Sequence, residues 1–459
     1  MKKFTFKGGV VPPERKELSN ECAIKDAFPS TKTVTIPVTM GGAPNQPVVK
    51  VGDVVKKGQL IATGDKFMNC PVHASIAGTV KKIGSFMVTT NVEVPCIVIQ
   101  ADETQETAYM EPLDPFTCDV KDALARIRDA GIVGMGGASF PTHVKLAPPP
   151  DKEIEYVLLN AAECEPYLTI DERTLQEETH RVIDGMAIVL RLMGAKGVVA
   201  LETNKSYIKP ILEKEIAECG YSDDITVVLV KTKYPQGAEK NIVKAVLGRE
   251  IPAGKLPADA GAVIINVGTV AAISDAFRLG KPLIERGLTI SGGAVANPCN
   301  IRVPVGTVVG DLIPQVFDLF PELTYKIISG GPMMGFAMTN AMFPVAKGTS
   351  GVIFLTKKET CDLEEDPCIG CGACIHVCPM HLTPVMINRE LKAEKLEGAK
   401  KFGLMDCIEC GCCAYVCPAH VHLVQRFRLG KALVRDEMMA KKAKEAMEAA
   451  KAEASQEKK

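Results

Sequence analysis

Eight of the seventeen cysteines fall into two copies of one spacing. Each copy reads Cys-x2-Cys-x2-Cys-x3-Cys-Pro, first from Cys368 to Pro379 and again from Cys407 to Pro418. In tandem runs of this kind, three cysteines bind one 4Fe–4S cube and the fourth binds the other cube. The spacing therefore predicts two clusters with crossed fourth ligands, the first held by Cys368, Cys371, Cys374 and Cys417, and the second by Cys407, Cys410, Cys413 and Cys378.

Zinc and disulfides are the competing interpretations of these cysteines. A structural zinc site needs four ligands in all and gives no reason for two quartets that each end in Cys-Pro. Disulfides need an oxidising compartment and are typical of small domains with little core. The doubled spacing favours iron–sulfur clusters, and two cubes in one fold imply an electron donor and an electron acceptor.

The composition limits the functional classes. The formal net charge is −1, so no basic surface for nucleic acid is indicated. No run reaches the ~18 apolar residues that cross a bilayer, and the first residues carry lysines without the apolar segment of a signal peptide. Many cysteines without an export signal are typical of a reducing cytoplasm. We therefore expect a soluble chain that partner subunits could hold at a membrane.

Residues 30–100 alternate short β segments with glycine and proline turns. Two units, Val48–Ala62 and Val72–Ile83, are separated by a hairpin and resemble the barrel-sandwich fold of biotinyl and lipoyl domains. Carriers of that fold bear a lysine at the hairpin tip. Lys66 stands in this hairpin, but the residues around it lack the carrier signature. A swinging-arm site and a purely structural barrel are the two interpretations, and we favour the second.

From about Asp119 helices and strands alternate, which is typical of a parallel sheet covered by helices. We expect helices over Val120–Ala130, Leu175–Met193 and Ala238–Leu247, and strands over Tyr156–Asn160, Val198–Leu201, Ile225–Val230 and Ala262–Asn266. Residues 286–343 return to short β segments with glycine-rich turns. The last stretch, Glu437–Lys459, is a charged, helix-prone tail to which we assign no chemistry.

A second chemical pattern is the glycine-rich stretch Gly131–Thr142, because closely spaced glycines let backbone N–H groups approach a phosphate. Lys145 follows, where its charge could balance that phosphate. Polar residues also follow successive strands, at Asn160–Pro166, Tyr234–Lys240 and Asn266–Thr269, where α/β folds place ligands. Such amides and carboxylates suit a flavin and its ribityl chain. A tight structural turn and ordinary helix caps are the alternative interpretation.

In this order, over about residues 125–345, these segments resemble the flavin subunit of respiratory complex I. With the barrel and the doubled cysteine motif added, the whole chain resembles the C subunit of the Rnf ferredoxin–NAD oxidoreductases. The resemblance implies that the FMN phosphate is held by Gly134, Gly136, Gly137 and Lys145, and that the flavin contacts Asn160, Glu163 and Asn266. It also implies that Phe140 stacks on the nicotinamide or adenine, and that Glu165 and Glu239 bind polar groups of NAD(H).

The resemblance implies a multidomain α/β fold. The expected order is a barrel-sandwich domain (1–110), a Rossmann-like α/β domain for FMN and NADH (115–285), a β-grasp module (286–345), a two-cluster ferredoxin-like domain (355–430) and a helical tail (431–459).

The implied function is the electron-input subunit of a membrane-bound, ion-translocating ferredoxin:NAD oxidoreductase. Such a subunit lies on the cytoplasmic face of the membrane and passes electrons between NAD(H), FMN and two 4Fe–4S clusters to membrane and ferredoxin-type partners. No catalytic acid, base or nucleophile is expected.

Two other functions remain open. One is a flavin and iron–sulfur reductase that acts on a corrinoid cofactor. The other is a non-enzymatic electron-relay subunit that has lost the nucleotide. The main support for the relay subunit is that Met135 and Ala162 stand where the complex I subunit has an arginine and an aspartate. Ala238 is a third departure, since the complex I subunit has a glutamate there.

Overall fold

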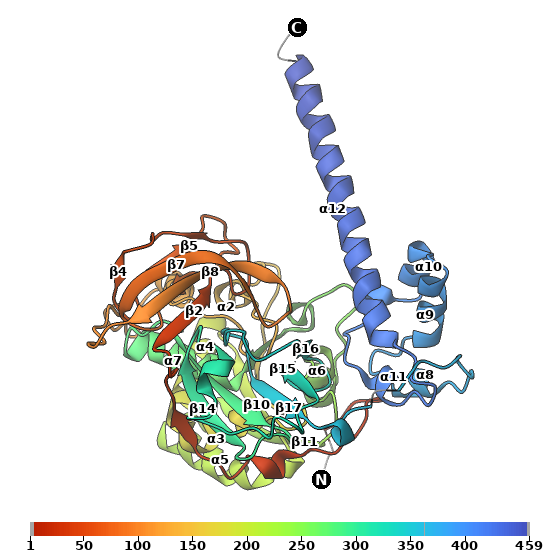
Figure 1. Cartoon of the computed structure of the whole chain (residues 1–459), viewed down its shortest axis with the longest axis horizontal. Helices are drawn as coiled ribbons and strands as arrows, with labels where there is room; N and C mark the ends of the chain where they lie inside the picture. Colours follow the sequence, from red (N-terminus) through yellow and green to blue (C-terminus); the bar gives the residue numbers. More distant parts are fainter. Residues whose placement is uncertain (1–3, 362, 457–459) are drawn as a thin grey trace. The chain divides into compact units, whose positions relative to one another are not determined.

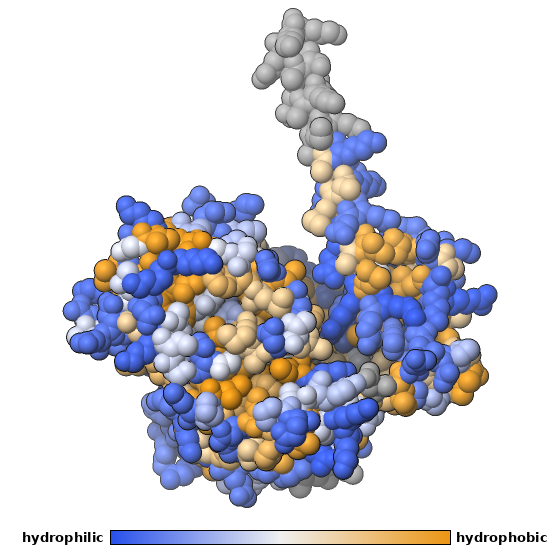
Figure 2. Space-filling model, viewed as in Figure 1, coloured by the Kyte–Doolittle hydropathy of each residue, from blue (hydrophilic) through white to orange (hydrophobic). Residues whose placement is uncertain are grey.

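The computed structural model describes residues 4–361 and 363–456, which divide into two compact units (Figure 1). Unit 1 comprises Met1–Phe6 and Val11–Asp362, and unit 2 comprises Lys7–Val10 and Leu363–Lys459. Hydrophilic residues cover much of the visible face of the molecule (Figure 2), as the charged fraction of 24% leads one to expect.

The amino-terminal part of unit 1 is a sandwich of two small antiparallel sheets, with strand orders β2-β8-β7-β4 and β3-β5-β6. Val34, Ile36, Ile61, Val80 and Ile97 are fully buried in its core. The strands are β2 (Thr33–Pro37), β3 (Gln46–Pro47), β4 (Val54–Val55), β5 (Leu60–Thr63), β6 (Val72–His73), β7 (Gly78–Met87) and β8 (Glu93–Ala101). The predicted barrel-sandwich architecture is confirmed.

The middle of unit 1 is a four-stranded parallel sheet with the order β11-β10-β9-β12. Alternate residues of β9 enter different cores: Val157 and Leu159 pack with α4 and α7, whereas Leu158 packs with α6. Helices therefore cover both faces. The strands are β9 (Tyr156–Ala161), β10 (Lys196–Glu202), β11 (Ile225–Val230) and β12 (Ala262–Asn266). The helices are α1 (Val120–Asp129), α2 (Thr142–Lys145), α3 (Ile170–Glu177), α4 (Thr179–Met193), α5 (Lys209–Glu218), α6 (Glu239–Leu247) and α7 (Val267–Arg278), with short 3₁₀ turns at Thr203–Ile208 and Pro257–Ala260.

One predicted helix is wrong in this domain. The sequence pattern predicted a single helix over Leu175–Met193, whereas the structure has α3 and α4 with a break at Glu178. Glu178 has a non-helical φ of −128° and ψ of 31°. Its carboxylate accepts hydrogen bonds from Arg181 and Arg302. Arg181 is a local partner, but Arg302 is 124 positions away, and helical periodicity cannot reveal such a tertiary contact.

A six-stranded mixed sheet completes unit 1, with the order β1-β14-β13-β17-β15-β16. Its strands are β1 (Ile24–Asp26), β13 (Glu285–Ser291), β14 (Cys299–Pro304), β15 (Lys326–Ser329), β16 (Phe336–Met338) and β17 (Gly351–Leu355). Strand β1 comes from near the amino terminus and pairs in parallel with β14. The sheet thus draws strands from outside residues 286–345. Short 3₁₀ turns lie at Lys16–Leu18, Val309–Leu312 and Lys357–Glu359.

Unit 2 is helical. Its elements are α8 (Ala373–Val377), α9 (Pro384–Lys392), α10 (Leu396–Lys401), a 3₁₀ turn at Leu404–Asp406, α11 (Cys412–Tyr415) and α12 (Leu423–Gln456). The predicted helical tail is thus the end of a longer helix; residues 457–459 lie outside the described part. Within residues 4–361 and 363–456, no helix combines the length and apolarity that a membrane span requires.

Candidate functional site

Two asparagines mark the carboxyl edge of the parallel sheet. Asn160 and Asn266 are register partners in the neighbouring strands β9 and β12. The Asn160 side chain donates a hydrogen bond to the carbonyl of Gly237 (2.8 Å). Asn266 caps helix α7 by accepting a hydrogen bond from the N–H of Gly268 (2.9 Å). Because ligands bind at this edge in α/β folds, both predicted flavin contacts lie where such a contact is possible.

The glycine-rich loop lies over this edge. The N–H of Gly134 donates to the carbonyl of Phe140 (2.8 Å) and closes the loop. A Cβ atom added to Gly136 would lie 3.7 Å from the Cβ of Asn266. Gly137 has a φ of +109°, and a Cβ added there would meet no protein atom within 4 Å. The loop thus presents an open, side-chain-free backbone, which fits the predicted phosphate cradle of FMN.

Lys145 and Glu239 meet beside the loop. Lys145 ends α2, Glu239 begins α6, and the lysine Nζ lies 2.6 Å from the glutamate Oε1. The same Nζ donates to the carbonyl of Ile264 in β12 (3.1 Å). Both side chains remain partly exposed, at 27% and 44%. The predicted phosphate lysine and a predicted nucleotide carboxylate therefore form one partly exposed pair.

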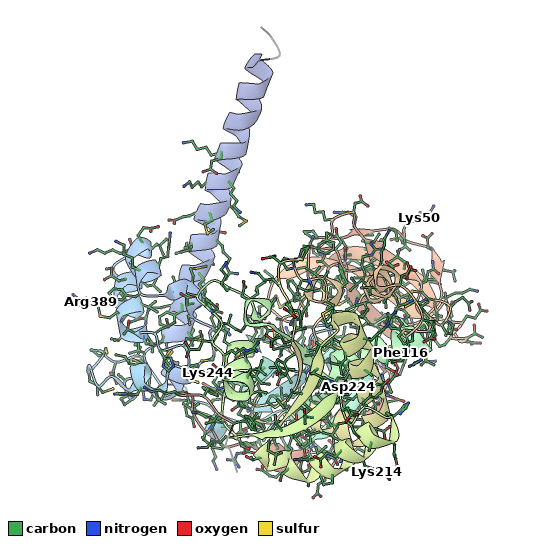
Figure 3. The ribbon with its side chains drawn as sticks, turned by 180° about the vertical axis from the view of Figure 1, so that it is seen from behind. Lys50, Phe116, Lys214, Asp224, Lys244 and Arg389 are labelled. Atoms are coloured by element: carbon green, nitrogen blue, oxygen red, sulfur yellow. The ribbon has the colours of Figure 1, made fainter. Side chains whose placement is uncertain are left out.

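Replacing Lys145 by alanine is expected to weaken FMN binding by about 1.5–3 kcal/mol, the usual contribution of a charged hydrogen bond. Quenching of flavin fluorescence on binding to the cofactor-free protein measures the dissociation constant. Lys244→Ala is the matched control, since Lys244 on α6, labelled in Figure 3, pairs with Glu250 at 2.9 Å and is not part of the loop sequence. Equal affinities for Lys145→Ala and the control would contradict the assignment.

Buried charged side chains form hydrogen bonds with the residues at the carboxyl edge of the sheet. Asp171 accepts a hydrogen bond from the Asn266 side chain (2.7 Å), and Arg286 donates to the carbonyl of Met135 (2.9 Å). Lys205 donates to the carbonyl of Ala162 (2.8 Å). Burial is the main cause that lowers the pKa of Arg286 to about 10. At Met135 and Ala162, where polar side chains of the complex I subunit are lost, the backbone itself is held by a buried cation.

Sequence reasoning missed these supporting residues. They are separated by long stretches of chain and share no motif: Asp171, Lys205 and Arg286, together with Lys16, whose Nζ lies 3.8 Å from the Glu163 carboxylate. Only the folding of four different segments brings them together. A lysine or arginine that is isolated in the sequence gives no sign of whether it will be buried.

Glu163, another predicted flavin contact, has a buried side chain that is 4% exposed. Its carboxylate accepts hydrogen bonds from the N–H groups of Asp171 (2.7 Å) and Glu172 (3.3 Å). Lys16 Nζ lies 3.8 Å away. Burial, opposed in part by Lys16, raises the pKa of Glu163 to about 8. The carboxyl group therefore holds a proton over much of the range in which an exposed glutamate is ionised.

Glu163→Gln is expected to change how stability depends on pH. Between the ordinary pKa of 4.5 and the raised value of about 8, the folded chain keeps a proton that the unfolded chain loses. The free energy of unfolding therefore falls as pH rises through this window, and the variant lacks that fall. Urea unfolding of the cofactor-free protein should show the variant gaining stability relative to the wild type between about pH 5 and about pH 8. Parallel pH profiles would contradict the raised pKa.

Glu165 and Phe140 are the remaining residues predicted to bind NAD(H). Among the described residues, the hydrogen bonds of Glu165 go to partners other than Lys145 and Glu239. The Glu165 carboxylate accepts hydrogen bonds from the N–H groups of Met333 (3.0 Å) and Met334 (2.9 Å). Burial raises its pKa to about 7. Phe140 is 39% exposed at the end of the glycine-rich loop. The roles in NAD(H) binding stay predictions for both residues.

Five cysteines of unit 2 line one cavity: Cys378, Cys407, Cys410, Cys412 and Cys413. Four of them are the members of the predicted second set, although Cys378 comes from the first motif; the fifth, Cys412, stands outside the cluster spacing. Burial raises the pKa of the Cys407 thiol to about 11, and the neighbouring Cys410 and Cys378 add to the rise. A cavity that gathers all four cysteines of this set fits an iron–sulfur cube, whose ligands are thiolates.

The predicted first set is more exposed. Cys368 and Cys371 are exposed, while Cys374 and Cys417 are intermediate. The pKa of Cys374 is raised chiefly by burial and also by the neighbouring charges of Cys368 and Cys417. Cys417 thus lies near cysteines of the other motif, as crossed ligation requires.

The two motifs share a backbone conformation. Positive φ angles occur at equivalent positions: Gly370 and Glu409, Gly372 and Gly411, and His381 and His420, all between 49° and 83°. Glu409 adopts at 56° the left-handed conformation that Gly370 adopts without a side-chain cost. Its carboxylate is paired with Lys431 at 2.8 Å. The spacing repeat in the sequence is therefore also a repeat of local structure.

Three family models match three separate parts of the chain. Residues 127–275 match the Nuo51 FMN-binding domain, residues 4–104 match the RnfC barrel sandwich hybrid domain, and residues 362–418 match a 4Fe–4S dicluster domain. The fold and these matches define a multidomain flavin and iron–sulfur protein of electron transfer.

Named relatives extend over most of the chain. It is 45% identical to the C subunit of the proton-translocating ferredoxin:NAD(+) oxidoreductase complex of Clostridium ljungdahlii, over 88% of each chain. It is 41% identical to the C subunit of the ion-translocating oxidoreductase complex of Rhodobacter capsulatus, over 94% of this chain and 83% of the relative. The corresponding Na(+)-translocating protein of Acetobacterium woodii is 41% identical, over 84% and 87%. The chain belongs to the family of C subunits of ion-translocating ferredoxin:NAD(+) oxidoreductase complexes, and the resemblance predicted from the sequence is confirmed.

Proposed function

We propose that this chain is the electron-input subunit of an ion-translocating ferredoxin:NAD oxidoreductase. One observation carries the proposal: a single chain combines an open glycine cradle over the edge of an FMN-domain sheet with two groups of four cysteines at cluster spacing. A flavin supplies the exchange between two-electron transfer with a nicotinamide and the one-electron transfer of which iron–sulfur clusters are capable. The protein supplies binding and orientation.

The residues of unit 1 have distinct parts in this proposal. The backbone at Gly134, Gly136 and Gly137 and the Lys145 ammonium hold the phosphate. Asn160, Glu163 and Asn266 orient the flavin along the strand ends, and Asp171 fixes the Asn266 amide through its hydrogen bond. Phe140, Glu165 and Glu239 admit NAD(H). In unit 2 the two predicted cysteine sets hold the clusters.

The proposal also covers the domain boundaries, the partner subunits and the location of the chain. We assign residues 115–285 to a Rossmann-like domain and 286–345 to a β-grasp module, between a barrel domain (1–110), a two-cluster domain (355–430) and a tail (431–459). The partners are the membrane and ferredoxin-type subunits of an Rnf complex, and the chain binds peripherally at the cytoplasmic face. The names of its relatives favour this function over a corrinoid reductase. An open cradle favours it over a relay without nucleotide.

Anaerobic mixing of the cofactor-loaded chain with NADH tests the proposal. We expect the flavin absorbance to bleach first and the broad cluster absorbance to follow, because the nucleotide site and the flavin site share unit 1. Glu239→Gln should slow the bleaching by NADH and leave reduction by dithionite unchanged. Clusters that dithionite reduces but NADH never reaches would contradict the proposed electron path.

A further inference from the structure

A turn of the barrel domain presses on the glycine-rich loop. Gly41 has a φ of +89°, and a Cβ added there would lie 1.8 Å from the carbonyl oxygen of Ser139. A Cβ added to Gly42, whose φ is +75°, would lie 2.8 Å from Cγ of Pro141. Real Cβ atoms essentially never approach other atoms more closely than 3.0 Å. Only glycines let the barrel backbone come this close to Ser139 and Pro141.

The hairpin tip of the barrel is tied down. The backbone N–H of Lys66 donates to the Asn69 side chain (2.6 Å). The Asn69 amide donates in turn to the carbonyls of Ala43 (3.1 Å) and Pro44 (2.9 Å), and it is 3% exposed. Carriers of this fold need a tip that is free to swing. This tip is instead bound to the turn that contains Gly41 and Gly42.

The same tip contacts helix α2, which follows the loop. The carbonyl of Phe67 lies 2.8 Å from Nε2 of His143. The two rings also meet edge to face, with centroids 5.7 Å apart and an interplanar angle of 82°. His143 stands two residues before Lys145, so this contact helps to place the end of the loop.

A buried lysine joins the barrel to the start of the loop. Lys347 is 1% exposed, and its Nζ donates to the carbonyls of Pro71 (2.9 Å) and Gly131 (2.7 Å). The barrel thus reaches the segment from Gly131 to Lys145 at its start, its middle and its end. Gly136 of the same loop lies next to Asn266, where an added Cβ would be 3.7 Å from the asparagine Cβ.

We propose that the barrel domain acts as a wall: its backbone packs against the cofactor loop and holds the loop in the conformation that binds FMN. Gly41 is the principal positioning residue of the barrel in this role. In this role the domain sets the affinity for FMN and carries no group of its own. The inference rests on the proposed cofactor loop. A loop backbone displaced by even about 1 Å loses the geometry on which phosphate contacts depend.

Gly41→Ala tests the inference, with Gly52→Ala as the matched control. Both glycines lie in the barrel at similar positive φ angles, +89° and +97°, but a Cβ at Gly52 meets nothing within 4 Å. The two variants share the backbone strain, and only the first pushes on Ser139. We expect FMN to bind at least about tenfold more weakly to Gly41→Ala and within about twofold of the wild type to Gly52→Ala. Fluorescence quenching measures the affinity, and the melting temperature of the cofactor-free protein reports on the fold.

His143→Ala provides a second test and decides the matter if Gly41→Ala does not fold. It removes the hydrogen bond to Phe67 and should weaken FMN binding about two- to fivefold, the loss of one hydrogen bond. If the folded variants at both positions bind FMN like the wild type while Gly137→Val does not bind it, the wall is wrong and the cofactor loop stands. If Gly137→Val also binds like the wild type, the cofactor loop itself is wrong.

Discussion

Replacing Cys368 by serine is expected to remove one of two 4Fe–4S clusters and to leave the other in place. A serine hydroxyl is a poor substitute for a thiolate ligand, so the cube of the first set loses one of its four protein bonds. Anaerobically reconstituted wild-type chain should contain about eight iron and about eight acid-labile sulfide, and the variant about half of each. Iron and sulfide analysis, with electron paramagnetic resonance of the dithionite-reduced protein, measures the loss.

Cys417→Ser separates crossed from local ligation. Cys417 belongs to the second motif by sequence but lies near Cys374 of the first. Crossed ligation predicts that Cys417→Ser and Cys368→Ser remove the same resonance, whereas local ligation predicts two different ones. Cys412→Ser is the control, because Cys412 is buried within the second motif but stands outside its spacing. It should keep the full iron content. Stoichiometric zinc without sulfide in the wild type would end the cluster assignment.

Gly137→Val is expected to abolish FMN binding. A Cβ atom at this position has no protein atom within 4 Å, although the φ of +109° is strained for any L side chain. The added side chain would occupy the space into which a phosphate must come to reach the backbone N–H groups. Flavin released by heat from the purified protein, and titration of the cofactor-free protein with FMN, both measure the effect.

The control for this variant is Gly52→Val. Gly52 has a φ of +97° against +109° at Gly137, and its Cβ also meets nothing within 4 Å. The two variants therefore carry a similar backbone cost at different places. Gly52→Val should bind FMN as the wild type does, and both should keep their clusters. Retention of FMN by Gly137→Val would remove the glycine-rich loop from the site.

Local patterns predicted all four strands of the parallel sheet, but they did not predict helices α2, α5 and α7. Strand β12 has the predicted bounds Ala262–Asn266, and helix α1 ends one residue before its predicted end. Hydrophobic runs and turn residues carry this information within a few neighbouring positions. The break at Glu178 and the pairing of β1 with β14 depend on residues more than a hundred positions away, and no local pattern contains them.

The candidate site shows the same limit. Asn160 and Asn266 could be placed together because they end adjacent parallel strands, and the cysteine sets followed from spacing alone. The charges behind the site could not be predicted. Lys205 and Arg286 act on the carbonyls of Ala162 and Met135, and nothing in the sequence distinguishes them from surface cations. The contact of Gly41 with Ser139 joins two domains and likewise needs the folded chain.

Reduction of the clusters by NADH in the presence and absence of FMN tests the central claim most directly. The wild type and Gly137→Val, both with reconstituted clusters, are mixed anaerobically with NADH, and cluster reduction is followed by electron paramagnetic resonance. The account predicts that NADH reduces the clusters of the wild type but not those of the FMN-free variant, while dithionite reduces both. Cluster reduction by NADH at the wild-type rate in the FMN-free variant would contradict an electron path through the flavin.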